Sequence, residues 1–378
     1  MLKTQFPDLA KWSLTMDAEW HISAAPYFLQ FKKPAGTSRG VMRKKESWFI
    51  SIRNKKTAQV FIGECGLLRS LSYDDRENYG LFLTDLCQRI NTENKKDWSS
   101  YRKELLEWPS IEFALETVFQ QMQFSSEEKF QLFSSDFLKA QKGIPINGLV
   151  WMSDLEDMML QVQAKIEQGY NCIKIKIGAL KWEDEFKLLQ EIRNRFGPKL
   201  HIRVDANGGF SHCDAIYTLH QLAQVKVHSI EQPIRQGNAE KMRDLCRNSE
   251  VDVALDEELI GCITRDDKVK LLDQIDPQYI VLKPSFIGGY RGTQEWIELA
   301  EDREIGWWIT SALESNIGLN AIAQWTACLN SDMAQGLGTG GLFTNNFPSP
   351  LVIKNTQLFY DPDQIWDVSL LETEQTSL

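Results

Sequence analysis

The chain has 378 residues, of which 43% are hydrophobic and 25% are charged, a composition typical of a globular protein with two domains or one large domain. Its formal net charge of −10 argues against general binding to nucleic acid or to an anionic membrane. Seven scattered cysteines without a C-x-x-C pair favour reduced thiols, and neither a signal-peptide core nor a bilayer-spanning apolar run occurs. We therefore expect a cytoplasmic protein.

The first third of the chain predicts an α+β domain. Strand-like runs come first and amphipathic helical stretches follow, at residues 27–31, 48–52, 58–68, 78–90 and 111–123. Strands followed by helices favour an α+β unit, which we place at 1–135. Between the first two strands, the basic and glycine-containing segment 36–46 is typical of an exposed hairpin loop.

From about residue 140, strand and helix patterns alternate. Seven strand candidates occur, at 147–150, 173–177, 201–205, 227–231, 252–256, 279–283 and 307–311. Helical patterns lie between them, such as 182–197, which ends on a glycine, and 211–223, which opens with Ser211 in a capping-box-like pattern. Repeated strand–helix units predict a parallel sheet, and their number favours a closed α/β barrel over 140–345.

Charged residues occupy the ends of five consecutive predicted strands. They are Lys176, Asp205, Glu231, Asp256 and Lys283, each about one strand–helix unit after the last. In a barrel of parallel strands, these ends face one common mouth, where active sites are built. Any one of them could cap a loop, but five in consecutive units indicate an active site.

Three of these five residues are carboxylates, which indicates a metal site. Oxygen ligands suit a hard divalent ion, so we expect Mg²⁺, or Mn²⁺ in its place. Zinc is disfavoured because no cysteine or histidine falls at these strand ends. The histidines nearby in the sequence are more typical of surface or supporting positions: His201, His212, His220 and His228.

Two lysines, Lys174 and Lys176, share one face of the predicted strand 173–177, flanked by isoleucines. Residues two apart on a strand lie about 6.5 Å apart. At an effective dielectric constant of about 20, two ammonium groups at that distance repel by roughly 2.6 kcal/mol. This repulsion is expected to lower the pKa of one lysine by about 2, so that it can act as a base near neutral pH.

Five short motifs resemble the enolase superfamily, in particular its muconate-lactonising subgroup. They are KIK at 174–176, DAN at 205–207, EQP at 231–233, ALDE at 254–257 and LKPS at 282–285. The resemblance implies a modified (β/α)7β barrel covered by an α+β capping domain. It also implies that the tail, 346–378, returns to that domain, and the strand-like run 351–361 supports this.

The resemblance also implies a role for each charged residue. Asp205, Glu231 and Asp256 would bind magnesium. Lys176 would be the general base and then the acid, Lys283 would stay protonated, and Lys174 would tune Lys176. One departure is Glu258, where many relatives have Ser or Thr. Substrate contacts would come from Arg203, Asn207, Ser311 and Gly336.

Within the subgroup, SALES at 311–315 and GLGTGG at 336–341 most resemble the o-succinylbenzoate synthase family. The reaction implied is a syn elimination of water from a cyclohexadiene carboxylate in menaquinone biosynthesis. Such a substrate carries two carboxylates. We therefore expect the basic segment 36–46 to close over the mouth, with Arg39, Arg43 or Lys44 on the succinyl carboxylate.

Other functions remain open at this point. N-succinylamino-acid racemases, cycloisomerases and dipeptide epimerases share the lysine pair, although the D-x-D motif of dipeptide epimerases is missing from 311–318. The glycines of 336–341 resemble a phosphate-binding loop, but this signal is weak alone. A non-catalytic binding protein would not need both lysines and all three carboxylates. The sequence leaves the oligomeric state undetermined.

Overall fold

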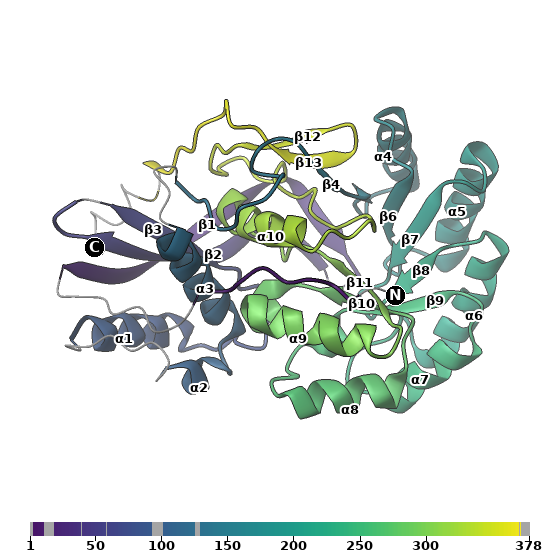
Figure 1. The fold of residues 1–378 in the computed structure, drawn as a ribbon. Helices are drawn as coiled ribbons and strands as arrows, with labels where there is room; N and C mark the ends of the chain where they lie inside the picture. Colours follow the sequence, from purple (N-terminus) through teal and green to yellow (C-terminus); the bar gives the residue numbers. More distant parts are fainter. Residues whose placement is uncertain are drawn as a thin grey trace.

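The computed structural model describes residues 3–10, 19–38, 40–57, 59–92, 101–124, 129–369 and 371. Its N-terminal part, here called the cap, is an antiparallel three-stranded sheet with three helices (Figure 1). These are β1 (Trp20–Thr37), β2 (Gly40–Asn54), β3 (Val60–Cys65), α1 (Tyr79–Thr92), α2 (Arg102–Leu105) and α3 (Pro109–Phe124). Helix α3 packs closely on the sheet, since a Cβ atom added at Gly63 would lie 2.1 Å from the Ala114 carbonyl oxygen.

The segment 36–46 is largely strand, which corrects the predicted loop. Strands β1 and β2 pair up to Thr37 and Gly40, with one irregularity between Gln30 and Ala35. Only a tight turn at Ser38 separates the described parts of the two strands. Pairing on both sides of this irregularity explains the difference, because the backbone hydrogen bonds of a long hairpin outweigh the polar, loop-like composition.

The second part is a parallel sheet of seven strands, in the order β5 to β11, surrounded by helices (Figure 1). In chain order the elements are β5 (Gly148–Val150), α4 (Leu155–Glu167), β6 (Cys172–Lys176), α5 (Trp182–Phe196), β7 (His201–Asp205), α6 (His212–Gln224), β8 (Ser229–Glu231), α7 (Ala239–Asn248), β9 (Asp252–Leu255), α8 (Arg265–Ile275), β10 (Tyr279–Leu282), α9 (Gly289–Glu301), β11 (Gly306–Ile309) and α10 (Asn316–Cys328).

A short eighth strand closes the barrel. Parallel bridges join Gln335 to Ile146, which precedes β5, and Gly336 to Thr310, which follows β11. The Gln335 N–H donates to the Pro145 carbonyl at 2.8 Å, and Gly336 continues this seam. Seven strand–helix units followed by a closing strand form the predicted (β/α)7β barrel, and the predicted fold class is confirmed.

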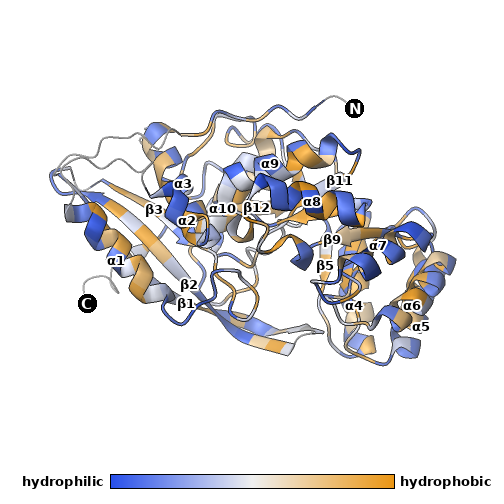
Figure 2. Ribbon diagram, turned by 90° about the horizontal axis from the view of Figure 1, so that it is seen from below, coloured by the Kyte–Doolittle hydropathy of each residue, from blue (hydrophilic) through white to orange (hydrophobic). Residues whose placement is uncertain are grey.

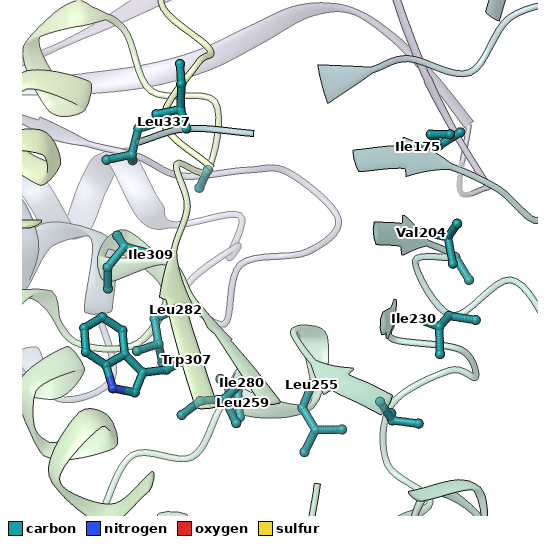
Figure 3. Close-up of a cluster of buried hydrophobic side chains, with 14 of the residues drawn as sticks. Ile175, Val204, Ile230, Leu255, Leu259, Ile280, Leu282, Trp307, Ile309 and Leu337 are labelled. Carbon is teal, nitrogen blue, oxygen red and sulfur yellow. The ribbon is translucent and has the colours of Figure 1, made fainter. Parts of the chain in front are cut away.

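Alternation along the barrel strands separates an apolar outer face from a polar interior. Figure 3 shows Ile175, Val204 and Ile230 on the neighbouring strands β6, β7 and β8, and all three are fully buried. They join one core cluster with helix residues such as Leu189. In Figure 2 both hydrophilic and hydrophobic colours run along α1, α5 and α6, as expected for helices with one buried side. Because strand neighbours point to opposite faces, Lys174 points into the barrel.

The tail lies between the barrel and the cap. Strands β12 (Leu351–Lys354) and β13 (Gln357–Tyr360) form a hairpin, and β13 pairs with β4 (Ile144–Pro145) ahead of the barrel. The Tyr27 hydroxyl of β1 donates to the Asn345 carbonyl at 2.9 Å. Side chains on both sides of this contact share one hydrophobic cluster: Tyr27, Leu29, Phe49, Phe343, Phe347, Val368 and Leu371.

A buried carboxylate of the cap binds the start of barrel helix α10. Glu64 of β3 accepts hydrogen bonds from the N–H groups of Ser315 and Gly318, both at 3.0 Å, and from the Ser47 hydroxyl at 2.7 Å. The Lys45 ammonium lies 3.8 Å from the same carboxylate, and neither side chain is exposed. A negative charge at a helix N-terminus is stabilising, so Glu64 holds the cap on the barrel.

A second pair of cap carboxylates meets helix α9. Glu116 of α3 accepts a hydrogen bond from the Tyr290 N–H at 2.5 Å, and the Arg291 guanidinium lies 3.3 Å from the same carboxylate. Burial and the charge of Glu116 raise the pKa of Glu112, one turn earlier, to about 8. Burial raises the pKa of Glu116 to about 7, although Arg291 opposes this shift.

Two observations complete the description of the chain. All seven cysteines are free. Within the described ranges, every helix is too short or too polar to cross a membrane.

Candidate active site

The structure brings the five predicted strand-end residues to one mouth of the barrel. Lys176, Asp205 and Glu231 are the last residues of β6, β7 and β8, and Asp256 and Lys283 directly follow β9 and β10. In the sheet register, Asp205 is the partner of both Lys176 and Glu231. The two lysines therefore stand at the two ends of a row of three carboxylates.

Direct contacts connect this row. The Asp205 Oδ2 atom lies 2.6 Å from Lys176 Nζ and 2.8 Å from Lys174 Nζ. Lys174 Nζ also lies 2.6 Å from each carboxylate oxygen of Glu231. Lys283 forms an ion pair with Asp256 at the other end. Each carboxylate therefore has an ammonium partner.

Burial and crowding shape the charges of the row. Asp205, Glu231 and Asp256 are at most 2% exposed. Burial and the charge of Asp205 raise the pKa of Glu231 to about 8, although Lys174 opposes this shift. Burial would raise the pKa of Asp205 as well, but Lys174 and Lys176 outweigh burial and hold that pKa well below its usual range. The carboxylates repel one another, so an added cation would stabilise them.

At Lys174, carboxylates from neighbouring strands outweigh the expected repulsion between the two lysines of β6. Burial lowers the pKa of Lys174, but the charges of Asp205 and Glu231 outweigh burial and raise it above its ordinary value. The prediction considered residues on the same strand and missed the acids across the sheet. Lys283 behaves similarly, because Asp256 raises its pKa against the effect of burial.

The donor atoms of the row fit a hard divalent cation. Three buried carboxylates at successive strand ends offer oxygen atoms alone, which Mg²⁺ prefers over the nitrogen and sulfur donors of zinc sites. His201 begins β7 and His228 directly precedes β8, so both lie at the N-terminal ends of these strands, away from this mouth. In the part of the chain that the structure describes, no three His, Cys, Asp or Glu side chains already form a ligand cluster, and the carboxylates pair with lysines instead.

A cavity of about 80 Å³ lies over the lysines. Its apolar lining comes partly from the cap, through Met42, Leu68 and Leu71. The β1–β2 hairpin reaches this mouth, since the Ser38 hydroxyl donates to the Ala206 carbonyl at 2.7 Å. The hairpin therefore closes one side of the cavity.

The basic residues of the hairpin do not line this cavity. Arg43 is exposed and is not among the residues that line the cavity. Lys44 is also exposed, with its ammonium 5.2 Å from the centre of the Phe28 ring. Neither side chain lines the cavity, so the structure gives no support to their predicted contacts with substrate. Arg39 falls outside the described residues.

Three predicted substrate contacts line the cavity. The Asn207 Oδ1 atom accepts from Lys176 Nζ at 2.8 Å, which orients the expected base. The Ser311 and Thr339 hydroxyls form a hydrogen bond of 2.7 Å, and Gly336 lies beside them. A side chain at Gly336 would collide with Thr310 in the closing seam, which explains the glycine.

Arg203 and Glu258 have structural roles. The Arg203 guanidinium lies 4.0 Å from the Trp308 ring centre and donates to the Ala334 carbonyl at 2.8 Å. It points into the barrel two residues before the mouth and is absent from the cavity lining, so its predicted contact with substrate stays a prediction. Glu258 accepts from the Gln232 side chain at 3.0 Å and from the Gly237 N–H at 2.9 Å, so it ties two loops together.

Sequence reasoning missed several cavity residues. Leu149, Trp151 and Phe286 are apolar residues that a sequence cannot distinguish from core. Asn147 gave a weak signal, as a polar residue directly at the start of the predicted strand 147–150.

The known proteins that resemble this chain in sequence and in structure agree with the family that its motifs resemble. The chain matches the family described as Enolase C-terminal domain-like over residues 157–360. It is 45% identical to an o-succinylbenzoate synthase of Desulfotalea psychrophila over 86% of this chain and 95% of that protein. The crystal structure of MenC from the same organism matches with a TM-score of 0.77 and 40% identity, over 90% of this chain and 99% of that one. A muconate lactonizing enzyme of Pseudomonas fluorescens, complexed with muconolactone, shares the fold with a TM-score of 0.77 at 20% identity, over 96% and 99% of the two chains.

Proposed function

This chain belongs to the enolase superfamily, and on that premise we propose that it is a magnesium-dependent o-succinylbenzoate synthase. This lyase would eliminate water from 2-succinyl-6-hydroxy-2,4-cyclohexadiene-1-carboxylate in menaquinone biosynthesis. The observation that carries the proposal is the 45% identity over 95% of a synthase. Seven free cysteines are consistent with a reducing, cytosolic location.

The row of charged residues supports the chemistry of this elimination. Asp205, Glu231 and Asp256 would hold Mg²⁺, which supplies positive charge beside the substrate carboxylate when bound. Lys176, oriented by Asn207, would remove the proton alpha to that carboxylate. The same lysine would return the proton to the departing hydroxyl, so that a C–H and a C–O bond break, a C=C bond forms and water leaves.

Lys283 would serve as a fixed positive charge. The neighbouring Asp256 raises its pKa, which favours the ammonium form. An ammonium at this end of the row would stabilise the negative charge that develops on the substrate. The apolar side chains of the cap, such as Met42, would exclude water from the reaction.

N-succinylamino-acid racemisation is a second candidate. The position of Lys176 and Lys283 at opposite ends of the row favours it, because a racemase needs a proton-transferring group on each side of its substrate. An elimination assay with the cyclohexadiene acid, run beside deuterium exchange into N-succinyl amino acids, separates the two activities.

Variants of the two lysines test the assigned roles. Lys176→Ala should abolish dehydration, because the base is lost. Lys283→Arg keeps the charge without an accessible neutral form, so it should retain more dehydration than racemisation. Asp205→Asn should weaken magnesium binding in calorimetry. Dehydration by Lys176→Ala at a near wild-type rate, or unchanged magnesium affinity in Asp205→Asn, would refute the corresponding role.

A further inference from the structure

Asn147 carries a buried carboxamide that the described chain leaves unpaired. The residue directly precedes β5, is 4% exposed and lines the cavity over the lysines. Its backbone N–H donates to the Gln335 carbonyl at 3.0 Å, which fixes it to the closing strand. Its Oδ1 atom is buried without a hydrogen-bond partner, and its carboxamide makes no hydrogen bond to the described residues.

Other buried amides of the chain show what a purely structural residue does. The Asn320 carboxamide, also fully buried, donates to the Phe130 carbonyl and accepts from Gln324, both at 2.9 Å. Leaving a buried polar group unpaired is destabilising, so such groups normally find a partner. Because Asn147 lines the cavity, its carboxamide can pair with a bound ligand, either through Oδ1 with a donor or, after the amide turns, through Nδ2 with an acceptor.

The cavity has two chemically different walls. The wall built by β6 and β10 carries Lys174, Lys176 and Lys283 beside the carboxylate row. The wall built by β5, β11 and the closing strand carries uncharged polar groups, among them Asn147 and the Ser311 hydroxyl. A substrate with its reacting carboxylate beside the lysines must extend its remaining polar groups toward the uncharged wall.

We propose that Asn147 donates a hydrogen bond to the terminal carboxylate of the succinyl arm and thereby selects substrates with two carboxylates. The choice of arm rests on the proposed function. The carboxamide can turn either end toward the cavity, and a carboxylate ligand requires the Nδ2 donor. Among the cavity residues that the structure describes, this wall holds no cation, so neutral donors bind the arm.

A comparison of two ligands with two variants tests this inference. The ligands are o-succinylbenzoate and 2-butanoylbenzoate, which has a methyl group in place of the terminal carboxylate. Calorimetry on the magnesium-loaded protein should show that Asn147→Ala weakens o-succinylbenzoate about 10- to 100-fold, the usual effect of losing a hydrogen bond to a charged group. Its binding of 2-butanoylbenzoate should change less than about threefold. Asn147→Asp, of nearly the same shape, should bind o-succinylbenzoate still more weakly, because the two carboxylates repel.

Arg43→Ala is the matched control, since Arg43 is a cation near the mouth that does not line the cavity. It should leave both affinities unchanged. A weaker affinity of this variant for o-succinylbenzoate, with an unchanged affinity for 2-butanoylbenzoate, would overturn the inference. Equal loss of both ligands in Asn147→Ala would also overturn it, as would equal affinities of the Asp and Ala variants for o-succinylbenzoate. Melting temperatures verify that each variant is folded. The melting temperature of Asn147→Ala should fall little, because the substitution removes an unpaired group.

Turnover separates this inference from the proposed function. In a synthase, Asn147→Ala should raise KM for the cyclohexadiene acid at least tenfold and retain kcat within about threefold. If the wild-type protein fails to dehydrate this acid but Asn147→Ala loses affinity for o-succinylbenzoate alone, the synthase is refuted and the role of Asn147 stands. If the wild-type protein dehydrates the acid and Asn147→Ala does not lose affinity for o-succinylbenzoate alone, only the role of Asn147 is refuted.

Discussion

Replacing Glu64 by Gln would test how the cap is held on the barrel. Each Glu64 carboxylate oxygen accepts two hydrogen bonds: Oε1 from the Ser315 N–H and the Ser47 hydroxyl, and Oε2 from the Gly318 N–H and the Ser315 hydroxyl. A glutamine keeps the shape but turns an NH2 group toward donors in either orientation. The substitution also leaves the Lys45 ammonium without its buried partner.

The expected loss follows from the complete burial of this pair. Removing one partner of a buried ion pair costs about 3–5 kcal/mol, because the remaining charge is uncompensated. The nearby Glu314 reduces the loss, since Lys45 also interacts with its carboxylate and opposes the rise in pKa that burial causes there. We therefore expect Glu64→Gln to lower the free energy of unfolding by about 3 kcal/mol, the lower end of that range.

Urea unfolding followed by tryptophan fluorescence measures this loss. The double variant Lys45→Met/Glu64→Gln removes both charges, so it should be more stable than Glu64→Gln alone. Glu64→Gln should also raise KM, because Ser315, the N-cap of α10, lies only four residues after Ser311 of the cavity wall. A loss below about 0.5 kcal/mol, or a double variant whose loss equals the sum of the single losses, would refute this reasoning.

Two further predictions concern the cap. In Glu112 the folded pKa of about 8 lies above the ordinary 4.5, so the folded state binds the proton more tightly and stability falls as pH rises between these values. The free energy of unfolding of Glu112→Gln should therefore rise by roughly 3 kcal/mol relative to that of wild type between pH 5 and pH 8 in urea titrations, and an unchanged difference would contradict the raised pKa. Gly63→Ala should lower the free energy of unfolding by about 1–3 kcal/mol, because the added Cβ meets the Ala114 carbonyl. Gly341→Ala is the control and should leave stability unchanged, since open space surrounds Gly341. Similar melting temperatures for the two variants would contradict the close packing.

Strand periodicity was sufficient to predict the row of charged residues at the mouth, whereas the repulsion between two lysines of one strand was not sufficient to predict the pKa of Lys174. Lys176, Asp205 and Glu231 could be placed at one mouth because parallel strands expose their C-terminal ends together. The raised pKa of Lys174 depends on acids of neighbouring strands, which become neighbours only once the register is known. The depth of Arg203 in the barrel could not be predicted for a related reason, because alternation predicts only the face of a strand on which a residue lies.

The two walls of the cavity differ in how the cap can influence them. The lysine–carboxylate row lies on β6 to β10, and its members bind one another. The uncharged wall includes Ser311, four residues before Ser315, whose N–H is held by Glu64 of the cap. A change in the cap can therefore move the uncharged wall without disturbing the lysine–carboxylate row. Substitutions at Glu64 should accordingly alter KM more than kcat.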